Sequence, residues 1–284
     1  MRLRLGSVEH DLTTRPLVMG MLDPSPASLG TGAGSADLVT RAGDLVGEGA
    51  DLLDVGGVWI ADGDVSEEEE LERVVPVVEA LRARFDVALS VDTWRARVLA
   101  ECCAAGAAIG NDLSGFADDE YLPTAVRAGA AVVATHVRLR PRPADARPLD
   151  VAAEVRAFLA ARVAQAAAAG VDPDSVIVDA GLDHGKTPGQ SLALLRESAT
   201  LADIGPPLLL SAAGRRFPGV VLDLDVDERR VATLAAAALG VSRGCRIVRA
   251  SDVRGARRVA DVLEAVLTAR LAQVEQADLE ESRG

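Results

Sequence analysis

Aromatic side chains are scarce in this 284-residue chain. Phe, Trp and Tyr make up 2% of it, so the core has to be built from aliphatic residues. There are three cysteines, two of them adjacent, which excludes a disulfide framework. Only three histidines and no CxxC motif are present, which argues against a zinc site. No apolar run approaches about 18 residues, and none follows the arginines of residues 1–5, so we expect neither a membrane span nor a secretory signal.

Positive charge is also in short supply. The chain has 30 Lys and Arg against 43 Asp and Glu, a net charge of -13. A surface this acidic repels phosphate backbones, so we expect no nucleic-acid partner. The charge is explained by solubility, and we expect a cytoplasmic protein.

Short Val-, Leu- and Ala-rich runs alternate with longer segments of helical pattern. Apolar strands separated by helices are typical of a parallel sheet, and eight such units without a break predict a closed (β/α)8 TIM barrel. A doubly wound open sheet is the rival fold. We expect one domain over residues 1–284, with a frayed acidic tail from about residue 275. The predicted strands are 17–21, 51–56, 88–92, 108–112, 131–136, 176–179, 207–211 and 245–250; the predicted helices include 35–49, 67–85, 94–105, 151–170, 188–202, 227–239 and 253–273.

Polar residues stand at or just after the carboxyl ends of these strands, and in a barrel those ends meet at one mouth. Any one of them could simply cap a helix or tie a loop. Together they indicate a binding site. The set comprises Asp23, Asp92, Asn111, His136, Asp179, Ser211, Arg249 and Ser251.

Three members of this set suit a nitrogen heterocycle. Asp92 and Asp179 are carboxylates, and a carboxylate can accept hydrogen bonds from adjacent ring N–H and NH2 groups in a bidentate pair. Asn111 can both donate and accept, which matches a mixed ring edge. The pattern favours a purine- or pterin-like ring over a sugar phosphate.

Seven sequence segments, in order, resemble the dihydropteroate synthase family over about residues 17–267. They are LVMGMLDPSPAS, GADLLDVGG, EEELERVVPVVEAL, LSVDTWRA, AAGAAIGNDLSG, VIVDAGLDHGKT and RIVRASDV. The resemblance implies loss of pyrophosphate from a hydroxymethyl-dihydropterin pyrophosphate and addition of the p-aminobenzoate amine to the methylene. In such a reaction the enzyme mainly orients the reactants and stabilises charge.

The resemblance also implies roles for individual residues. Asp92, Asn111 and Asp179 match the family's pterin anchors. Arg249 matches the arginine that stacks on the pterin and contacts the leaving group, and Arg215 stands where the family has a lysine. Both arginines are therefore the expected catalytic residues. The family usually dimerises through its last helices, so we expect a homodimer.

Several positions depart from the family pattern around the pyrophosphate and the second substrate. Asp23 replaces an Asn, and Ile60, Ala61 and Asp62 replace Thr, Arg and Pro in the second loop. Further departures are His184 for an apolar residue, Ser211 for a Gly, Ala213-Gly214 for Ser-Arg, and Ser251 for a His. Because each hydrogen bond to a charged group contributes about 1.5–3 kcal/mol, these losses predict weak catalysis. Asp23 could ligate Mg2+; we expect no tightly bound organic cofactor.

The predicted function is therefore a pterin-binding protein in which condensation with p-aminobenzoate is weak or lost. One alternative is a working synthase, which could use another acceptor amine and be aided by Arg138, Arg140, Arg142 or Arg216. Another is a methyltetrahydrofolate-binding methyltransferase with a cobalamin partner.

Three further sequence features could be read as functional, and each also has a structural interpretation. GLDHGKT looks like a Walker A loop, but Ala180 stands where that motif needs Gly, so we read Lys186 as a lysine at a helix start. For His136, contact with a ligand and ordinary packing remain equally open. Trp59 could stack on a ring or only cover the top of the barrel.

Overall fold

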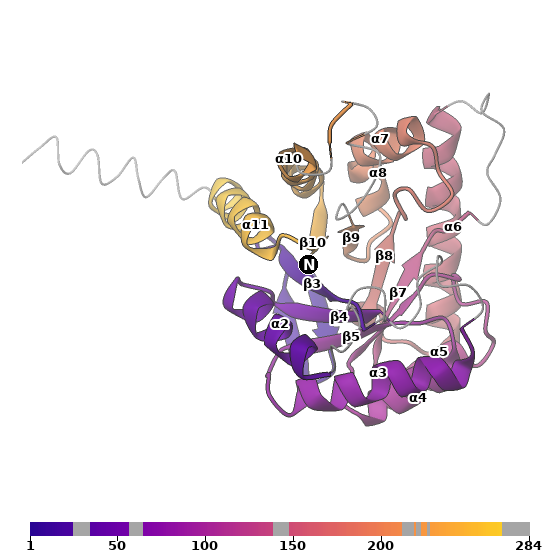
Figure 1. Cartoon of the computed structure of the whole chain (residues 1–284). Helices are drawn as coiled ribbons and strands as arrows, with labels where there is room; N and C mark the ends of the chain where they lie inside the picture. The colour runs from indigo at the N-terminus through magenta and orange to yellow at the C-terminus, as the bar shows by residue number, and fades with distance from the viewer. Residues whose placement is uncertain are drawn as a thin grey trace, which may run out of the picture.

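A closed barrel of eight parallel strands forms the centre of the protein (Figure 1). The structure is a computed structural model that describes residues 1–24, 35–56, 65–138, 148–211, 219, 223–225 and 228–268. The barrel confirms the predicted TIM fold against the open sheet, and each predicted strand ends within one residue of the observed one. In barrel order the strands are β3 (Leu17–Leu22), β4 (Leu52–Gly56), β5 (Ala88–Asp92), β6 (Ile109–Asp112), β7 (Ala131–Thr135), β8 (Val176–Asp179), β9 (Leu208–Ser211) and β10 (Cys245–Ala250).

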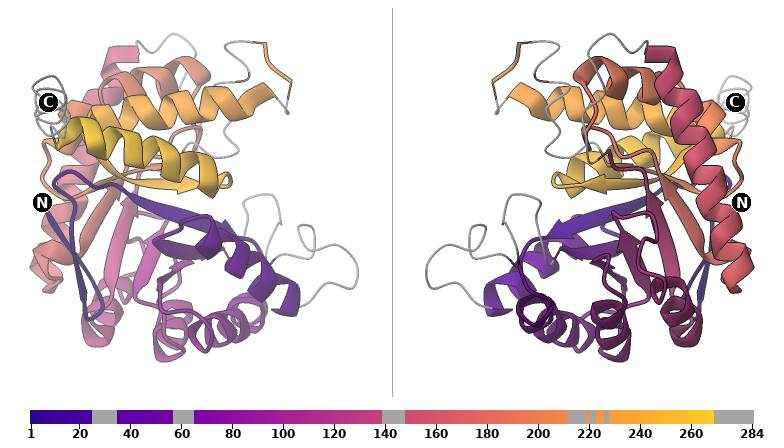
Figure 2. Two further views of the ribbon diagram at one scale, coloured as in Figure 1. Left: turned by 90° about the vertical axis from the view of Figure 1, so that its left-hand side faces the viewer. Right: turned by 90° about the vertical axis from the view of Figure 1, so that its right-hand side faces the viewer.

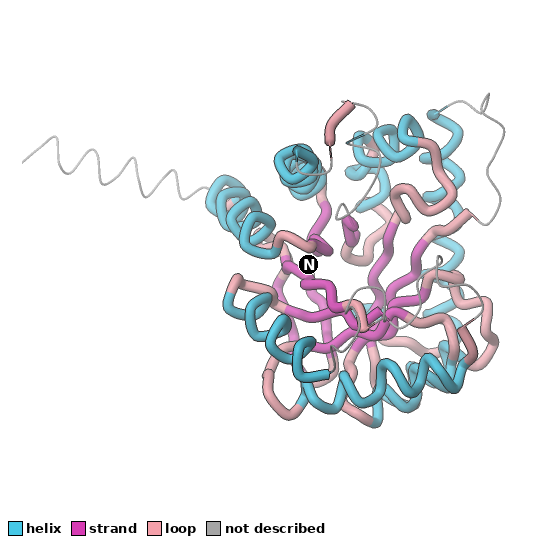
Figure 3. Tube along the Cα trace, viewed as in Figure 1, coloured by secondary structure: helices cyan, strands magenta, loops and turns pink. Residues whose placement is uncertain are grey.

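Helices surround the strands, as Figure 3 shows. They are α2 (Ser35–Gly47), α3 (Glu67–Arg82), α4 (Ala96–Ala104), α5 (Tyr121–Ala128), α6 (Pro148–Ala169), α7 (Pro188–Arg196), α8 (Ser198–Ala202), α10 (Arg229–Ser242) and α11 (Val253–Leu267), with the 3-10 turn η1 (Pro173–Ser175). Two details differ from the expectation. Helix α5 was not predicted, because it is short and contains Pro123. The single helix expected over 188–202 is divided at Glu197, which is the C-cap of α7 and the N-cap of α8.

An antiparallel hairpin at the N-terminus, β1 (Arg2–Leu5) and β2 (Val8–Asp11), was also not predicted. Leu3 and Leu5 point inward from β1, and with Leu12 they join the cluster of apolar residues inside the barrel. In Figure 2 the indigo hairpin lies at the end of the barrel away from the carboxyl ends of the strands. The hairpin therefore closes the amino end and leaves the carboxyl end as the mouth.

The inward-facing side chains form an apolar layer below a polar one, because alternate residues of a strand face the same side. The apolar layer contains Met19, Leu52, Ile109, Val133, Ile177, Leu209 and Ile247. Two residues further along each strand, at the next inward position, stand Met21, Asp54, Asn111, Thr135, Asp179, Ser211 and Arg249, with Ser90 and Asp92 on β5. The strand period thus places the polar set at the mouth.

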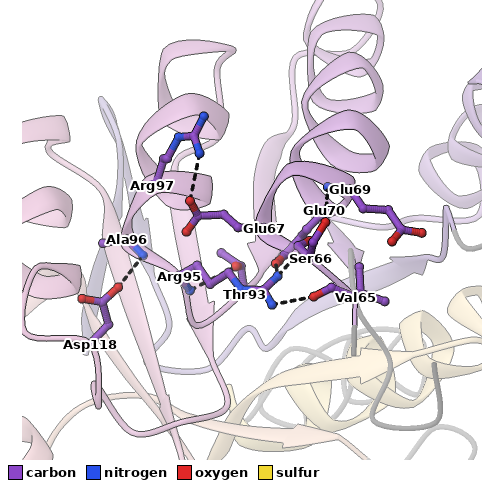
Figure 4. Close-up of polar contacts among 10 residues, drawn as sticks. All are labelled: Val65, Ser66, Glu67, Glu69, Glu70, Thr93, Arg95, Ala96, Arg97 and Asp118. Atoms are coloured by element: carbon purple, nitrogen blue, oxygen red, sulfur yellow. Dashed lines mark hydrogen bonds and ion pairs between the residues drawn. The ribbon is translucent and has the colours of Figure 1, made fainter. Parts of the chain in front are cut away.

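The start of α3 is fixed against the loop after β5 by Arg95 (Figure 4). Its guanidinium pairs with the fully buried Glu70 and donates to the Val65 carbonyl at 2.6 Å and the Ser66 carbonyl at 3.3 Å. Ser66 is the N-cap of α3, and its Oγ accepts from the Glu69 N–H at 3.2 Å. These contacts hold the end of β5, and with it Asp92, in a fixed place.

The acidic tail expected from about residue 275 lies outside the described residues, and so do residues 139–147. No helix in the described part of the chain is long and apolar enough to cross a membrane.

Candidate functional site

Arg249 is the centre of a buried polar cluster at the mouth. Its Nε and Nη2 both lie 2.7 Å from Asp54 Oδ2, and Nη2 lies 3.3 Å from Asp92 Oδ2. The Asn111 side chain donates to the same Asp54 oxygen at 3.4 Å. Side chains from β4, β5, β6 and β10 are therefore joined in one network.

This network keeps Arg249 charged. Burial alone would lower the pKa of its guanidinium, but attraction to Asp54, Asp92 and Asp179 outweighs that cost and the pKa is raised. Arg249 is 9% exposed, so its charge lies in a low-dielectric setting, where its ion pairs with Asp54 and Asp92 are stronger than they would be in water. The structure thus places Asp92, Asn111, Asp179 and Arg249 at one end of the barrel, as predicted.

Asp179, at the end of β8, is held by a tight turn. Its Oδ1 accepts a hydrogen bond from the Gly181 N–H at 2.7 Å. Gly181 has a φ of 63°, a backbone conformation that residues other than glycine rarely adopt. A Cβ at Gly181 would lie 2.0 Å from the His136 carbonyl oxygen. The turn therefore requires glycine for both its conformation and its space.

Lys186, the one lysine of the chain, crosslinks this turn to the end of β7. Its buried Nζ donates to the carbonyls of His136 at 2.8 Å, Gly181 at 2.7 Å and His184 at 3.3 Å. It precedes Thr187, the N-cap of α7, where the sequence places a helix-start lysine. An ammonium has three donors and so can satisfy three carbonyls at once, which makes Lys186 a structural crosslink and not a phosphate ligand.

His136 is 4% exposed and packs edge-on against Phe158, with ring centroids 4.8 Å apart. Its Nδ1 is buried and has no hydrogen-bond partner among the described residues. Burial first, and then Lys186 and Arg138, lower the pKa of His136 to about 4. Of the two interpretations left open by the sequence, these contacts support packing.

This low pKa predicts that the protein becomes less stable at acidic pH. The unfolded chain binds a proton at His136 near pH 6.5 and the folded one only near pH 4, so stability falls as pH drops through this window. Between pH 7 and pH 4.5, His136 should lower the free energy of unfolding by about 2 kcal/mol. We expect this decrease to be absent in His136→Gln. Urea unfolding at the two pH values measures it, with exposed Arg243→Gln as the control. An unchanged difference in the His136 variant would contradict the assignment.

A family model described as "Pterin binding enzyme" matches residues 23–251. The dihydropteroate synthase of Bacillus subtilis is 35% identical over 262 residues, covering 89% of this chain and 89% of the relative. The chain belongs to the pterin-binding enzymes of the dihydropteroate synthase type.

Two further relatives differ in the activity that their names state. A Mycobacterium leprae protein named "Inactive dihydropteroate synthase 2" is 37% identical over 264 residues, covering 89% of this chain and 91% of its own. A solved Xanthomonas albilineans dihydropteroate synthase with 4-aminobenzoic acid superposes with a TM-score of 0.87 at 32% identity, covering 93% of this chain and 97% of that one. The relatives of this chain therefore include dihydropteroate synthases and a protein named inactive.

The positions that depart from the family pattern have different surroundings. Ser251 is exposed after β10, Asp23 is half-buried after β3, and His184 is half-buried before α7. Ser211 is 1% exposed at the end of β9. Asp62, Arg215 and Trp59 lie outside the described residues, as do Ile60, Ala61 and the segment 213–214.

Of the arginines that could compensate for lost cations, Arg138 is already engaged. Its Nε lies 2.9 Å from Glu154 Oε1, Nη2 pairs with the other oxygen of that carboxylate, and Nη1 lies 3.5 Å from Gln190 Oε1. These contacts direct Arg138 to α6 and α7. Arg140, Arg142 and Arg216 lie outside the described residues.

Asp54 is the residue of this site that the sequence reading missed. The sequence did contain a signal for it. Asp54 stands in the apolar strand LLDVGG, two residues after Leu52, so both side chains point into the barrel. A buried acid is rarely tolerated without a partner, so it pointed to a cation on another strand.

For Mg2+, the described residues contain no group of three His, Cys, Asp or Glu side chains that could hold a metal. Mg2+ commonly uses one or two carboxylates together with substrate phosphates and water. Asp23 fits that partial role, as the single carboxylate after β3. Bound there, the ion would neutralise pyrophosphate charge.

Proposed function

We propose that this protein binds a pterin ring at the barrel mouth and condenses it only weakly, or not at all, with p-aminobenzoate. The observation that carries the proposal is the buried cluster in which Arg249 joins Asp92, Asp54 and Asn111, with Asp179 close enough to raise the pKa of Arg249. The carboxylates of this cluster accept hydrogen bonds from ring N–H groups, and Arg249 supplies a permanent positive charge.

The residues suggest a division of labour. Asp92 and Asp179 accept from the amino and ring N–H groups of the pterin, and Asn111 matches a mixed edge. Arg249 covers the ring and stabilises the departing anion, while Arg215 has the position of the family's lysine. Positioning and charge stabilisation are the main sources of rate in such a transfer.

Weak condensation is inferred from the second loop and Ser251. Ile60, Ala61 and Asp62 lack the hydroxyl, the guanidinium and the ring of the family residues, and Ser251 has no imidazole. Asp23 repels pyrophosphate unless a metal covers it.

Ordinary synthase activity is the second candidate. It is favoured by the 33–35% identity to dihydropteroate synthases along nearly the whole chain. Use of another acceptor amine, the methyltetrahydrofolate alternative and the cytoplasmic location remain predictions.

Titration calorimetry with 6-hydroxymethylpterin tests the binding part. We expect Asp179→Asn to weaken binding by about tenfold or more, since a hydrogen bond to a charged group contributes about 1.5–3 kcal/mol. Asp203→Asn is the matched control, because Asp203 is the exposed C-cap of α8, ahead of β9 at the amino end of the barrel. Equal binding by both variants would contradict the proposed site.

We also propose a homodimer through α10 and α11, which lie side by side in Figure 1. Both helices expose apolar side chains: Val231 (75% exposed) and Leu239 (40%) on α10, and Val262 (63%) and Val266 (58%) on α11. Exposed apolar surface often marks an interface. We expect Val262→Asp with Val266→Asp to give a monomer in sedimentation experiments, and Val8→Asp on the hairpin to leave the dimer intact. A monomeric native chain would contradict this part.

A further inference from the structure

We propose that Asp54 is a positioning residue that holds Arg249 back from Asp92, so that the Asp92 carboxylate stays available to the ligand. The inference rests on the proposed pterin site and assigns a specific task to a buried residue beneath it.

The geometry shows an unequal sharing of Arg249. Two of its nitrogens, Nε and Nη2, lie 2.7 Å from Asp54 Oδ2, whereas Asp92 Oδ2 is reached only by Nη2 and at 3.3 Å. Short charge-assisted contacts of this kind are the strong ones. Asp54 is therefore the main counter-ion of Arg249, and Asp92 is the secondary one.

Asp54 itself is out of reach of a ligand. It is 0% exposed and stands level with Ser90, one inward position below Asp92 on the neighbouring strand. Its Oδ2 also accepts from Asn111, so one oxygen positions two residues of the mouth. Asp54 acts on the pterin only through them.

Loss of the Asp54 charge would change the balance within the cluster. Arg249 would remain buried and charged, and a buried charge needs a counter-ion. Asp92 is the next acceptor already in contact with it. The guanidinium would turn to Asp92 and compete with the pterin N–H groups for the same carboxylate.

A double-mutant cycle separates this role from general damage. The variants are Asp54→Asn, Arg249→Met and the double variant, each titrated with 6-hydroxymethylpterin by calorimetry and unfolded thermally. We expect Asp54→Asn to raise the Kd about tenfold or more in the native background, and less than about twofold when Arg249→Met is already present. We also expect the double variant to have a higher Tm than Arg249→Met alone, because it no longer buries an unpaired carboxylate.

Asp51→Asn is the matched control. Asp51 is half-buried and pairs with Arg257 at 2.9 Å, but it lies just before β4 at the opposite end of the barrel. We expect it to lower the Tm while leaving the Kd within about twofold. If Asp54→Asn does not fold, Arg249→Met against the double variant still gives the Tm comparison, and Asp54→Glu replaces Asp54→Asn in the Kd comparison.

Equal effects of Asp54→Asn on the Kd in both backgrounds would overturn the inference, as would an unchanged Kd in a native background that binds pterin. Absence of pterin binding by the native chain would instead contradict the proposed function, and with it the ligand-directed role of Asp54. The Tm comparison judges the Asp54–Arg249 pairing in either case.

Discussion

Changing Ile60→Thr, Ala61→Arg, Asp62→Pro and Ser251→His together should raise p-aminobenzoate-dependent release of pyrophosphate by about a hundredfold or more. The change restores a hydroxyl, a guanidinium and an imidazole that the family pattern places at the anion and the acceptor. Each charged hydrogen bond contributes about 1.5–3 kcal/mol, and about 1.4 kcal/mol corresponds to tenfold in rate. Two restored hydrogen bonds are therefore enough for the expected hundredfold increase in rate.

Two controls make this result interpretable. Ser251→His alone should give a smaller gain than the four changes together, since it restores one contact. The native chain assayed with and without Mg2+, beside Asp23→Ala, tests compensation by a metal. Native activity that requires Mg2+ and falls sharply in Asp23→Ala would support a working synthase. No gain from the four changes would place the obstacle elsewhere, at Ser211, His184 or Gly214.

Lys186→Met should destabilise the protein by about 3 kcal/mol or more and abolish measurable pterin binding. Its ammonium satisfies three carbonyls around the turn that carries Asp179. Each buried acceptor left without a donor costs about 1–3 kcal/mol. The expected fall in Tm is about 6 °C or more for a chain of this size.

Lys186→Arg should not rescue the loss, because a planar guanidinium cannot direct donors to three carbonyls around one point. Arg243→Met is the control, since this exposed arginine also donates to a carbonyl, that of Arg196 at 2.8 Å. A Lys186→Met protein as stable as this control would show that the crosslink contributes little.

The barrel could be predicted because its strands are continuous apolar runs of the length that a buried parallel strand needs. The elements missed had weaker signals. In β1, Leu3 and Leu5 alternate with Arg2 and Arg4, but four residues are too few to separate a strand from a charged end. Helix α5 is eight residues long and contains Pro123, and both features weaken the sequence signal for a helix.

The site was predictable where residue type and strand phase agree. Asp92, Asn111, Asp179 and Arg249 each stand at an inward position at the end of a strand, so topology alone brings them to one mouth. The contacts that join them depend on side-chain geometry between distant strands, such as the 195 residues that separate Asp54 from Arg249. Local pattern reveals the buried acid but not its partner, and so the pairing of Asp54 with Arg249 and the carbonyl contacts of Lys186 emerged only from the structure.

The central claim is tested most directly by one paired measurement on the native protein with 6-hydroxymethyl-dihydropterin pyrophosphate. Calorimetry gives its affinity, and a coupled assay follows pyrophosphate release with p-aminobenzoate present and absent. We predict clear binding of the pterin and little or no acceleration of release by p-aminobenzoate. Failure to bind any pterin at millimolar concentration, or turnover equal to that of the Bacillus subtilis relative assayed in parallel, would contradict the account.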